Sequence, residues 1–308
     1  MGFTADAATF VRLAKAAESL GYDAVWANDH LLTPRFLRDD PDGPPNFYEP
    51  LITLAHVAAV TTRIRLGTAV LALPLRDPQL LAKQAATLDA LTRGRLLLGV
   101  GLGAYPEELA ESHPDLAGHG RGVVFDEHLA TLRDLLSLGD RAPVPVQRPI
   151  PLYIGGHGTR DVERAARYGQ GWIPGWQPIT VVRERIALLR SRLAEAGRDA
   201  RAVDVAPELS ATIAPRHEDA VRRYEESRFV RHRLSHDRAG RDGELMTASN
   251  LVGSADAIRE RVAALAKAGV DHCAALAFPA ETVPELLEQW DQFATEVVRP
   301  MRATPSDE

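Results

Sequence analysis

The sequence repeats one structural unit, which is an amphipathic helix followed by a glycine and a short apolar strand. In the first copy, the apolar residues recur at the i, i+3, i+4, i+7 spacing of one helix face: Phe10, Leu13, Ala14, Ala17 and Leu20. Gly21 is suited to end this helix, and residues 23–27 follow as a strand. A chain built from such units must alternate helices with strands.

The unit recurs along most of the chain. The predicted helices span 51–60, 78–92, 125–137, 159–168, 180–196, 255–268 and 282–297. The further predicted strands span 64–70, 95–100, 151–155, 171–175, 203–212 and 270–278. Apolar strands without alternation are typical of a parallel sheet covered by helices. We therefore predict an α/β fold, a TIM-type (β/α)8 barrel, with residues 1–308 as a single domain.

The start of the chain departs from this pattern. About seven strands are predicted where a barrel needs eight, and the stretch before the first helix is too short for an ordinary strand. Three explanations remain open: the first strand is missing, residues 1–4 form a truncated strand, or the sheet is open.

Three long connections interrupt the otherwise short loops, at 31–50, 101–124 and 214–250. Connections of this length are usually lids or binding loops. Each follows a predicted strand, and in a barrel such loops lie at the C-terminal face, where active sites are built. Their common position predicts an enzyme.

Charge and composition exclude several classes of partner. The formal net charge of −6 argues against a nucleic-acid surface, and no apolar run reaches the roughly 18 residues of a membrane span. Cys273 is the only cysteine, so no disulfide forms within the chain, which fits a reducing cytoplasm. Its apolar surroundings favour a buried structural thiol over a catalytic one.

A polar triplet ends the first strand, where Asn28, Asp29 and His30 open a long connection. A histidine at a strand end, with a carboxylate beside it, suits general-base work near neutral pH. In the alternative interpretation, Asp29 caps a turn and His30 bonds to the backbone. Position alone does not decide between the two.

Two glycine-rich stretches also follow strands. Gly99, Gly101 and Gly103 would let a ligand approach the backbone. Gly99, Gly101 and Ala104 match a dinucleotide-binding spacing, but no strand ending in an acid follows about 20 residues later.

The second glycine-rich stretch, Gly155, Gly156, His157, Gly158 and Thr159, leads from a strand into a helix. Its backbone N–H groups could hold a phosphate at the helix N-terminus, although a plain tight turn could use the same glycines. It also lies nearer the middle of the chain than the commonest barrel phosphate site. No metal site is predicted.

Several stretches together resemble the bacterial luciferase-like flavin and deazaflavin oxidoreductases: LAKAAESLGYDAVWANDHLL, VTTRIRLGTAVLALPLRDPQLLAKQAATLDALTRGRLLLGVGLG, PLYIGGHGTRDVERAARYGQGW and LVGSADAIRERVAALAKAGVD. The resemblance covers residues 5–298 and is strongest to the branch that uses coenzyme F420. It implies an (α/β)8 barrel with a strand before the first helix, and it implies a homodimer.

The resemblance also implies where the cofactor lies. The segment from Thr68 to Val70 matches the strand that supports the flavin-type ring, with the Ala69–Val70 bond as a non-prolyl cis peptide. The loop 155–159 matches the phosphate-binding loop, and Gly101, Gly103 and Ala104 would complete the cofactor site. His30 matches the base that acts on a substrate alcohol, and Asp29 would orient it.

Two departures from the family pattern concern the substrate side. Ala104 stands where related dehydrogenases commonly carry a glutamate acid, and Glu107 and Glu108 follow three and four residues later. The segment after helix 125–137 is also shorter than usual.

We predict hydride transfer between a small organic substrate and a flavin-type cofactor, with F420 favoured over FMN and with a flavin or F420 reductase as a possible partner. One alternative is a two-component monooxygenase that uses O2 and receives reduced FMN from such a reductase. A second alternative, of another class, is a non-catalytic flavin-binding accessory subunit.

Overall fold

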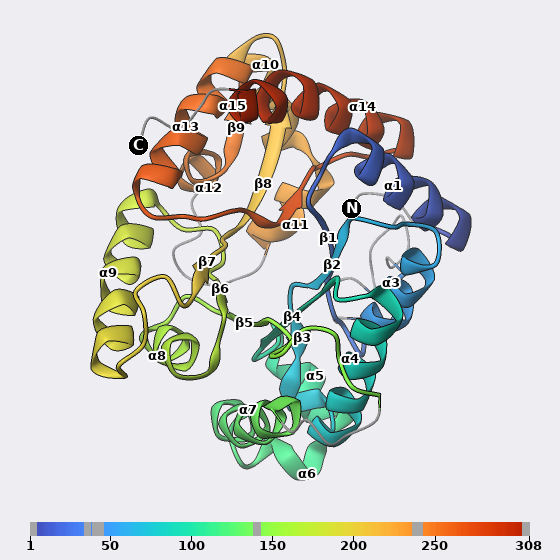
Figure 1. Ribbon diagram of the computed structural model, residues 1–308. Coiled ribbons are helices and arrows are strands. Elements are labelled where there is room, and N and C mark those ends of the chain that lie inside the picture. Colours follow the sequence, from blue (N-terminus) through green and yellow to red (C-terminus); the bar gives the residue numbers. More distant parts are fainter. Residues whose placement is uncertain (1–4, 34–37, 39–45, 138–142, 236–242, 304–308) are drawn as a thin grey trace. The chain divides into compact units, whose positions relative to one another are not determined.

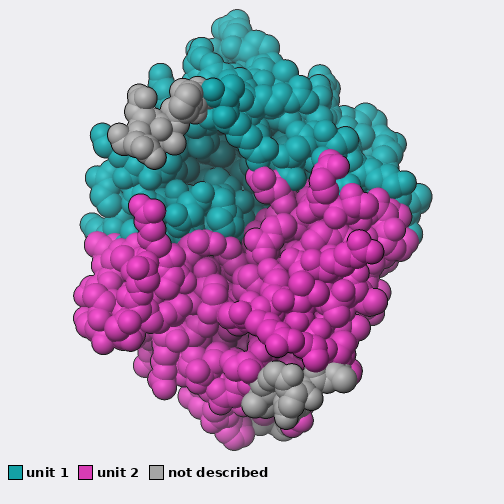
Figure 2. All heavy atoms as spheres, in the orientation of Figure 1, with its two compact units in different colours: residues 1–22, 174–186, 205–308 teal, residues 23–173, 187–204 magenta. Residues whose placement is uncertain are grey.

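The computed structural model describes residues 5–33, 38, 46–137, 143–235 and 243–303. Helices and strands alternate along it (Figure 1), and the strand pairs with a determined register are parallel, which confirms the predicted α/β class. The chain divides into two units (Figure 2): unit 1 contains residues 1–22, 174–186 and 205–308, and unit 2 contains residues 23–173 and 187–204.

Unit 2 is built on a parallel sheet. Its strands lie in the order β1 (Ala24–Ala27), β2 (Arg65–Thr68), β4 (Leu96–Gly101), β5 (Leu152–Gly155) and β6 (Gly171–Ile173), followed by β7 (Asp204–Val205), whose first residue belongs to this unit. The short β3 (Leu71–Ala72) pairs with β4. Every residue of β4 and β5 is buried, as expected for strands covered on both faces.

The helices of unit 2 connect these strands. They are α3 (Pro50–Ala58), the 3₁₀ turn η1 (Leu73–Leu75), α4 (Pro78–Thr92), α5 (Pro106–Ser112), α6 (Pro114–Ala117), α7 (Arg121–Ser137) and α8 (Thr159–Tyr168). Proline in the first turn is common among them, and a carboxylate precedes it in two cases. Glu49 accepts from the Ile52 N–H and Asp77 from the Leu80 N–H, so the sequence encodes both helix starts.

Unit 1 carries a three-stranded parallel sheet in the order β10 (Ala274–Ala277), β8 (Glu208–Ile213), β9 (Leu251–Gly253). Its helices are α1 (Ala7–Leu20), α10 (His217–Glu226), α11 (Arg228–Ser235), α12 (Gly243–Ser249), α13 (Ala255–Lys267), α14 (Val283–Phe293) and α15 (Arg299–Ala303), with the π-helical turn η2 (Ala294–Val298). Helix α9 (Ile179–Glu195) runs from unit 1 into unit 2.

The first repeat ends as the sequence predicts. Gly21 takes a left-handed conformation (φ 86°) directly after α1, and its N–H donates to the last-turn carbonyls of that helix. The Tyr22 hydroxyl then donates to the Trp290 carbonyl oxygen at 2.9 Å, and burial raises the pKa of this phenol. The Tyr22 ring also packs edge-on against Phe278, which fixes the end of α1 within unit 1.

The structure differs from the predicted elements in several places. The predicted strand 203–212 is two strands, β7 and β8, separated at Ala206 and Pro207, because proline cannot donate a ladder hydrogen bond. Strands β3 and β9 were not predicted. The predicted loops 101–124 and 214–250 carry the helices α5, α6 and α10–α12, so they are not structureless connections.

Two predictions concern segments that the structure covers little or not at all. Most of the connection 31–50 lies outside the described residues, and residues 1–4, the place of a truncated first strand, do so entirely. Within the described ranges, no helix combines the length and apolar character needed to cross a membrane.

Candidate active site

The predicted site residues of unit 2 gather at one edge of its sheet. His30 lies three residues beyond β1, whereas Thr68, Gly101 and Gly155 end β2, β4 and β5. These strands are parallel neighbours, so their carboxyl ends meet at the same edge. Three strand spacings of about 4.8 Å separate β1 from β5, which puts the whole row within about 14 Å.

The His30 side chain is mostly buried beside a carboxylate and two aromatic rings. Its Nδ1 atom lies 3.3 Å from Oε2 of Glu108, and only 13% of the side chain is exposed. The ring centroids of Phe47 and Tyr105 lie 4.4 Å and 5.4 Å from the centroid of the imidazole. The imidazole is therefore held on one nitrogen and enclosed by apolar faces.

Glu108 is the residue that sequence reasoning undervalued. It is 3% exposed in the first turn of α5, and its Oε1 atom accepts from the Leu32 N–H at 3.3 Å. The sequence signal was the Pro106-Glu107-Glu108 run, because proline followed by acids is typical of a helix start. Had a helix been predicted at Pro106, one of the two acids in its first turn could have been expected to face the end of β1.

The hydrogen bonds that the predicted orienting residue, Asp29, accepts come from groups other than His30. Asp29 Oδ2 accepts from the Ala72 N–H at 3.0 Å and from Arg76 Nε at 2.9 Å, and Oδ1 accepts from Arg76 Nη2 at 2.8 Å. Arg76 also pairs with Glu49 at 2.9 Å. Burial acts to lower the pKa of Arg76, but the bonds and charges of Asp29 and Glu49 outweigh it and raise that pKa. Asp29 therefore anchors the strand edge.

Replacing Asp29 with asparagine is expected to lower the free energy of unfolding by about 3 kcal/mol, because it breaks a buried ion pair. The Asp29 side chain is 4% exposed and that of Arg76 is 16% exposed. Urea unfolding would measure the loss. The matched control is Asp134→Asn in the exposed pair with Arg133, where a change within about 1 kcal/mol is expected. Unchanged stability together with lost turnover would instead support the predicted orienting role of Asp29.

The peptide bond between Ala69 and Val70 is cis, at the position where the family resemblance places such a bond. These two residues are partly exposed, whereas Thr68 before them and Leu71 after them are buried. Thr68 is held by β4, because its hydroxyl donates to the Gly99 carbonyl oxygen at 2.8 Å and accepts from the Gly99 N–H at 2.9 Å. We call this partly exposed pair of residues at the strand edge the Ala69–Val70 step.

The Val70 side chain packs against Gly101 of β4 and Gly155 of β5. A Cβ atom on Gly101 would come within 2.5 Å of Val70 Cγ2, and one on Gly155 would come within 2.7 Å of Val70 Cγ1. Because both residues lack a side chain, valine lies directly against two strand ends. The resulting surface is small, apolar and partly exposed, and it fits the face of a flat ring. Gly103 and the exposed Ala104 continue from β4, and the Gly103 carbonyl accepts from Arg121 at 2.9 Å.

The glycine loop between β5 and α8 is held firmly from within. The Gly156 N–H donates to the Ile173 carbonyl oxygen at 3.0 Å, and the Gly156 carbonyl accepts from the Trp172 indole at 2.7 Å. The Gly158 N–H donates to Asp161 Oδ2 at 3.0 Å. Two of the amides expected to bind phosphate are therefore engaged within the protein.

The remaining part of this loop still fits an anion. His157 and Thr159 are exposed at the N-terminus of α8. The negative charge of Asp161 is balanced by Arg164, which donates to Asp161 Oδ1 at 2.9 Å and pairs with Asp126 at 2.6 Å. A phosphate would thus meet the end of a helix dipole rather than an unpaired carboxylate.

The surroundings of Cys273 argue against a reactive thiol. Burial raises the pKa of the Cys273 thiol to about 12, so it stays protonated near neutral pH, which agrees with a structural role. Among the described residues, no three His, Cys, Asp or Glu side chains are placed to hold a metal ion.

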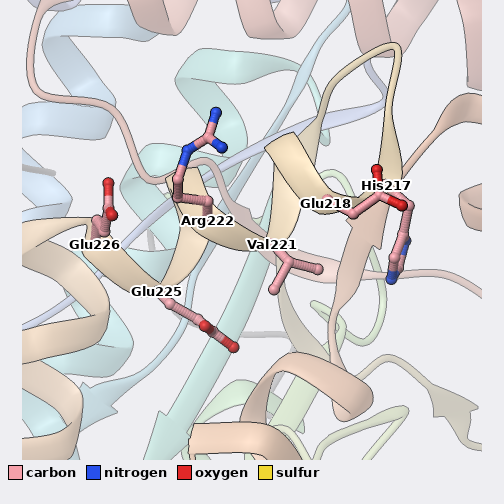
Figure 3. A pocket seen from close by; sticks show the side chains of 6 residues that line it. All are labelled: His217, Glu218, Val221, Arg222, Glu225 and Glu226. Atoms are coloured by element: carbon pink, nitrogen blue, oxygen red, sulfur yellow. The ribbon is translucent and has the colours of Figure 1, made fainter.

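A surface depression of about 380 Å³ lies elsewhere, along α10 of unit 1 (Figure 3). Its lining comes from that single helix: His217, Glu218, Val221, Arg222, Glu225 and Glu226. None of the predicted site residues borders it. Five of the six lining side chains are exposed, so it is a feature of the surface rather than an enclosed site.

Comparison with known proteins matches residues 2–272 to the model of the luciferase-like monooxygenase family. A phthiodiolone/phenolphthiodiolone dimycocerosates ketoreductase of Mycobacterium tuberculosis is 32% identical over 253 residues. That alignment covers 70% of this chain and 64% of the ketoreductase.

Solved structures share the fold. Monooxygenase RslO1 from Streptomyces bottropensis superimposes with a TM-score of 0.80 at 23% identity, covering 96% of this chain and 94% of its own. The coenzyme F420 dependent tetrahydromethanopterin reductase from Methanopyrus kandleri does so with a TM-score of 0.72 at 19% identity, covering 96% of each chain. At these identities the likeness establishes a luciferase-like TIM-barrel fold.

Proposed function

Because the chain belongs to the luciferase-like monooxygenase family, we propose that it transfers a hydride between a small organic substrate and a flavin-type cofactor, with F420 favoured. The observation that carries the proposal is the row of groups at one sheet edge. His30, paired with a buried glutamate, and the accessible Ala69–Val70 step belong to neighbouring strand ends.

The cofactor would be held by residues at and just beyond the ends of β2, β4 and β5. Ala69 and Val70 would support the ring, with Gly101, Gly103 and Ala104 beside it, and the exposed His157 and Thr159 would face the phosphate at the start of α8. When bound, the ring would supply the carrier for the hydride. The protein contributes position, an apolar surface and a proton acceptor.

The substrate we propose is an alcohol, or the carbonyl compound formed from it. His30 would exchange the hydroxyl proton, because an imidazole suits general acid–base work near neutral pH. The rings of Phe47 and Tyr105 beside it favour an apolar carbon skeleton next to the reacting group. A ketoreductase among the relatives, at 32% identity, supports carbonyl chemistry.

Ala104 favours a second candidate, a monooxygenase that receives reduced FMN and activates O2. Related F420-dependent dehydrogenases commonly carry a glutamate acid at this position, and here the side chain is an exposed methyl group. In that reaction His30 would hydrogen-bond near the ring rather than take a hydroxyl proton.

Binding titrations would test the proposal. Purified protein is titrated with F420, with FMN and with anaerobically reduced FMN, and absorbance and fluorescence report binding. We expect the tightest binding for F420, and hydride transfer to it from a secondary alcohol without oxygen uptake. Tight binding of reduced FMN followed by oxygen consumption would favour the monooxygenase. Failure of all three to bind would overturn both.

Riboflavin, which lacks the phosphate, is the matched control ligand for FMN. If the α8 N-terminus holds the phosphate, FMN should bind roughly tenfold more tightly, since about 1–2 kcal/mol is the usual contribution of such a contact. Equal affinities would remove the loop 155–159 from the proposed site.

A further inference from the structure

We infer that Glu108 is the positioning residue of His30 and holds the imidazole in the tautomer whose hydrogen is on Nδ1. The inference rests on the proposed function, in which His30 exchanges a proton with the substrate. It assigns a role to a residue outside the family's glutamate position, which Ala104 occupies here.

Both oxygens of the Glu108 carboxylate are engaged at the strand edge. Oε1 accepts from the Leu32 N–H at 3.3 Å, and Oε2 lies 3.3 Å from His30 Nδ1. An ionised carboxylate can only accept hydrogen bonds, so Nδ1 must carry the hydrogen that joins them. With 3% of the Glu108 side chain exposed, solvent competes little for this contact.

Other charged groups near His30 are paired elsewhere. Asp29, its neighbour in sequence, is bound by Arg76. Glu111, one turn after Glu108 on α5, pairs with Arg38 at 2.9 Å. Phe47 and Tyr105 occupy positions beside the imidazole ring with no formal charge. Among the described residues, Glu108 is thus the carboxylate that faces Nδ1.

The tautomer decides what His30 can do. With the hydrogen on Nδ1, Nε2 keeps a lone pair and can accept a proton. In alcohol oxidation the O–H bond breaks and its proton moves to Nε2, while the C–H bond breaks and its electron pair leaves with the hydrogen as hydride for the cofactor. The carbonyl forms, and Glu108 compensates the charge of the resulting imidazolium. Reduction is the reverse.

Glu108→Gln tests the inference, because glutamine presents one oxygen and one NH2 group. The Leu32 N–H needs the oxygen, so the NH2 group faces His30 Nδ1 and moves the ring hydrogen to Nε2. We expect kcat to fall by on the order of 10²–10⁴-fold, the full contribution of a general base, with little change in KM.

Nitrogen-15 NMR of the histidine rings reads the tautomer without cofactor or substrate. The His30 signals are assigned by their loss in His30→Ala. We expect the hydrogen on Nδ1 in the native protein and on Nε2 in Glu108→Gln. The control is Glu107→Gln, which removes the same charge from the same turn of α5 and should keep both the native tautomer and the native kcat.

Each outcome decides the inference. A native spectrum with the hydrogen on Nε2 overturns it, even if Glu108→Gln fails to fold. A native tautomer in Glu108→Gln, or a kcat equal to that of Glu107→Gln, overturns it as well. If His30→Ala keeps full turnover, the proposed function fails. If His30→Ala is inactive but Glu108→Gln is not, only the inference fails.

Discussion

Replacing His30 with alanine is expected to reduce kcat by on the order of 10²–10⁴-fold, the usual contribution of a positioned general base. The imidazole is held by Glu108 at the end of β1, beside the accessible Ala69–Val70 step. Removing it leaves the hydroxyl proton without an acceptor, whereas the groups proposed to bind the cofactor remain. Cofactor affinity should therefore change little.

Rapid-mixing measurement of hydride transfer to the bound cofactor would isolate this step from product release. The matched control is His56→Ala, which removes an exposed histidine from the last turn of α3 and should leave the rate unchanged. If His30→Ala transfers hydride as fast as this control, His30 is not the base. If neither variant nor the native protein turns over any alcohol, the accessory-subunit hypothesis gains support.

Replacing Gly99 with alanine is expected to lower the free energy of unfolding by roughly 3 kcal/mol or more, because the new methyl group overlaps backbone. A Cβ atom at this position would overlap the Thr68 carbonyl oxygen and lie 3.3 Å from Ile173 Cδ1. The two hydrogen bonds between Thr68 and Gly99 hold β2 against β4, so neither strand can shift without losing them.

Chemical unfolding followed by circular dichroism would measure this loss. Gly118→Ala is the matched control, since a Cβ atom there meets nothing within 4 Å and the backbone is right-handed helical (φ −72°). Its effect should stay within about 0.5 kcal/mol. Equal stability of the two variants would show that the sheet edge accommodates a side chain at Gly99.

The fold class could be read from the sequence because its signals are local. Helix periodicity, the glycine after several of the helices and unbroken apolar strands each reflect short-range geometry, and the structure has the predicted alternation. Elements shaped by their neighbours were harder to predict. Strand β9 was not predicted, and Pro207 divides a run that composition alone would join into one strand.

For His30, the sequence indicated its place at the end of a strand but not the group that contacts it. The strand-end rule placed His30 just beyond the carboxyl end of a strand, and in the structure it follows β1. Adjacency in sequence favoured Asp29 as its partner, yet the structure brings Glu108 there across 78 positions of chain and gives Asp29 to Arg76. A contact between residues so far apart in the chain could be predicted only if the helix that carries Glu108 were recognised first. That helix, α5, lies in a segment that was predicted as a long connection.

Helix α5 lies in the long connection 101–124, which an engineer could exchange to change selectivity, and it also contacts His30. It supplies the carboxylate that faces His30, and Tyr105, directly before it, supplies one of the rings beside the same imidazole. Grafting residues 101–124 from a homologue to change selectivity would therefore also exchange the groups that contact His30. Chimeras that retain Tyr105 and Glu108 would be the ones to build first.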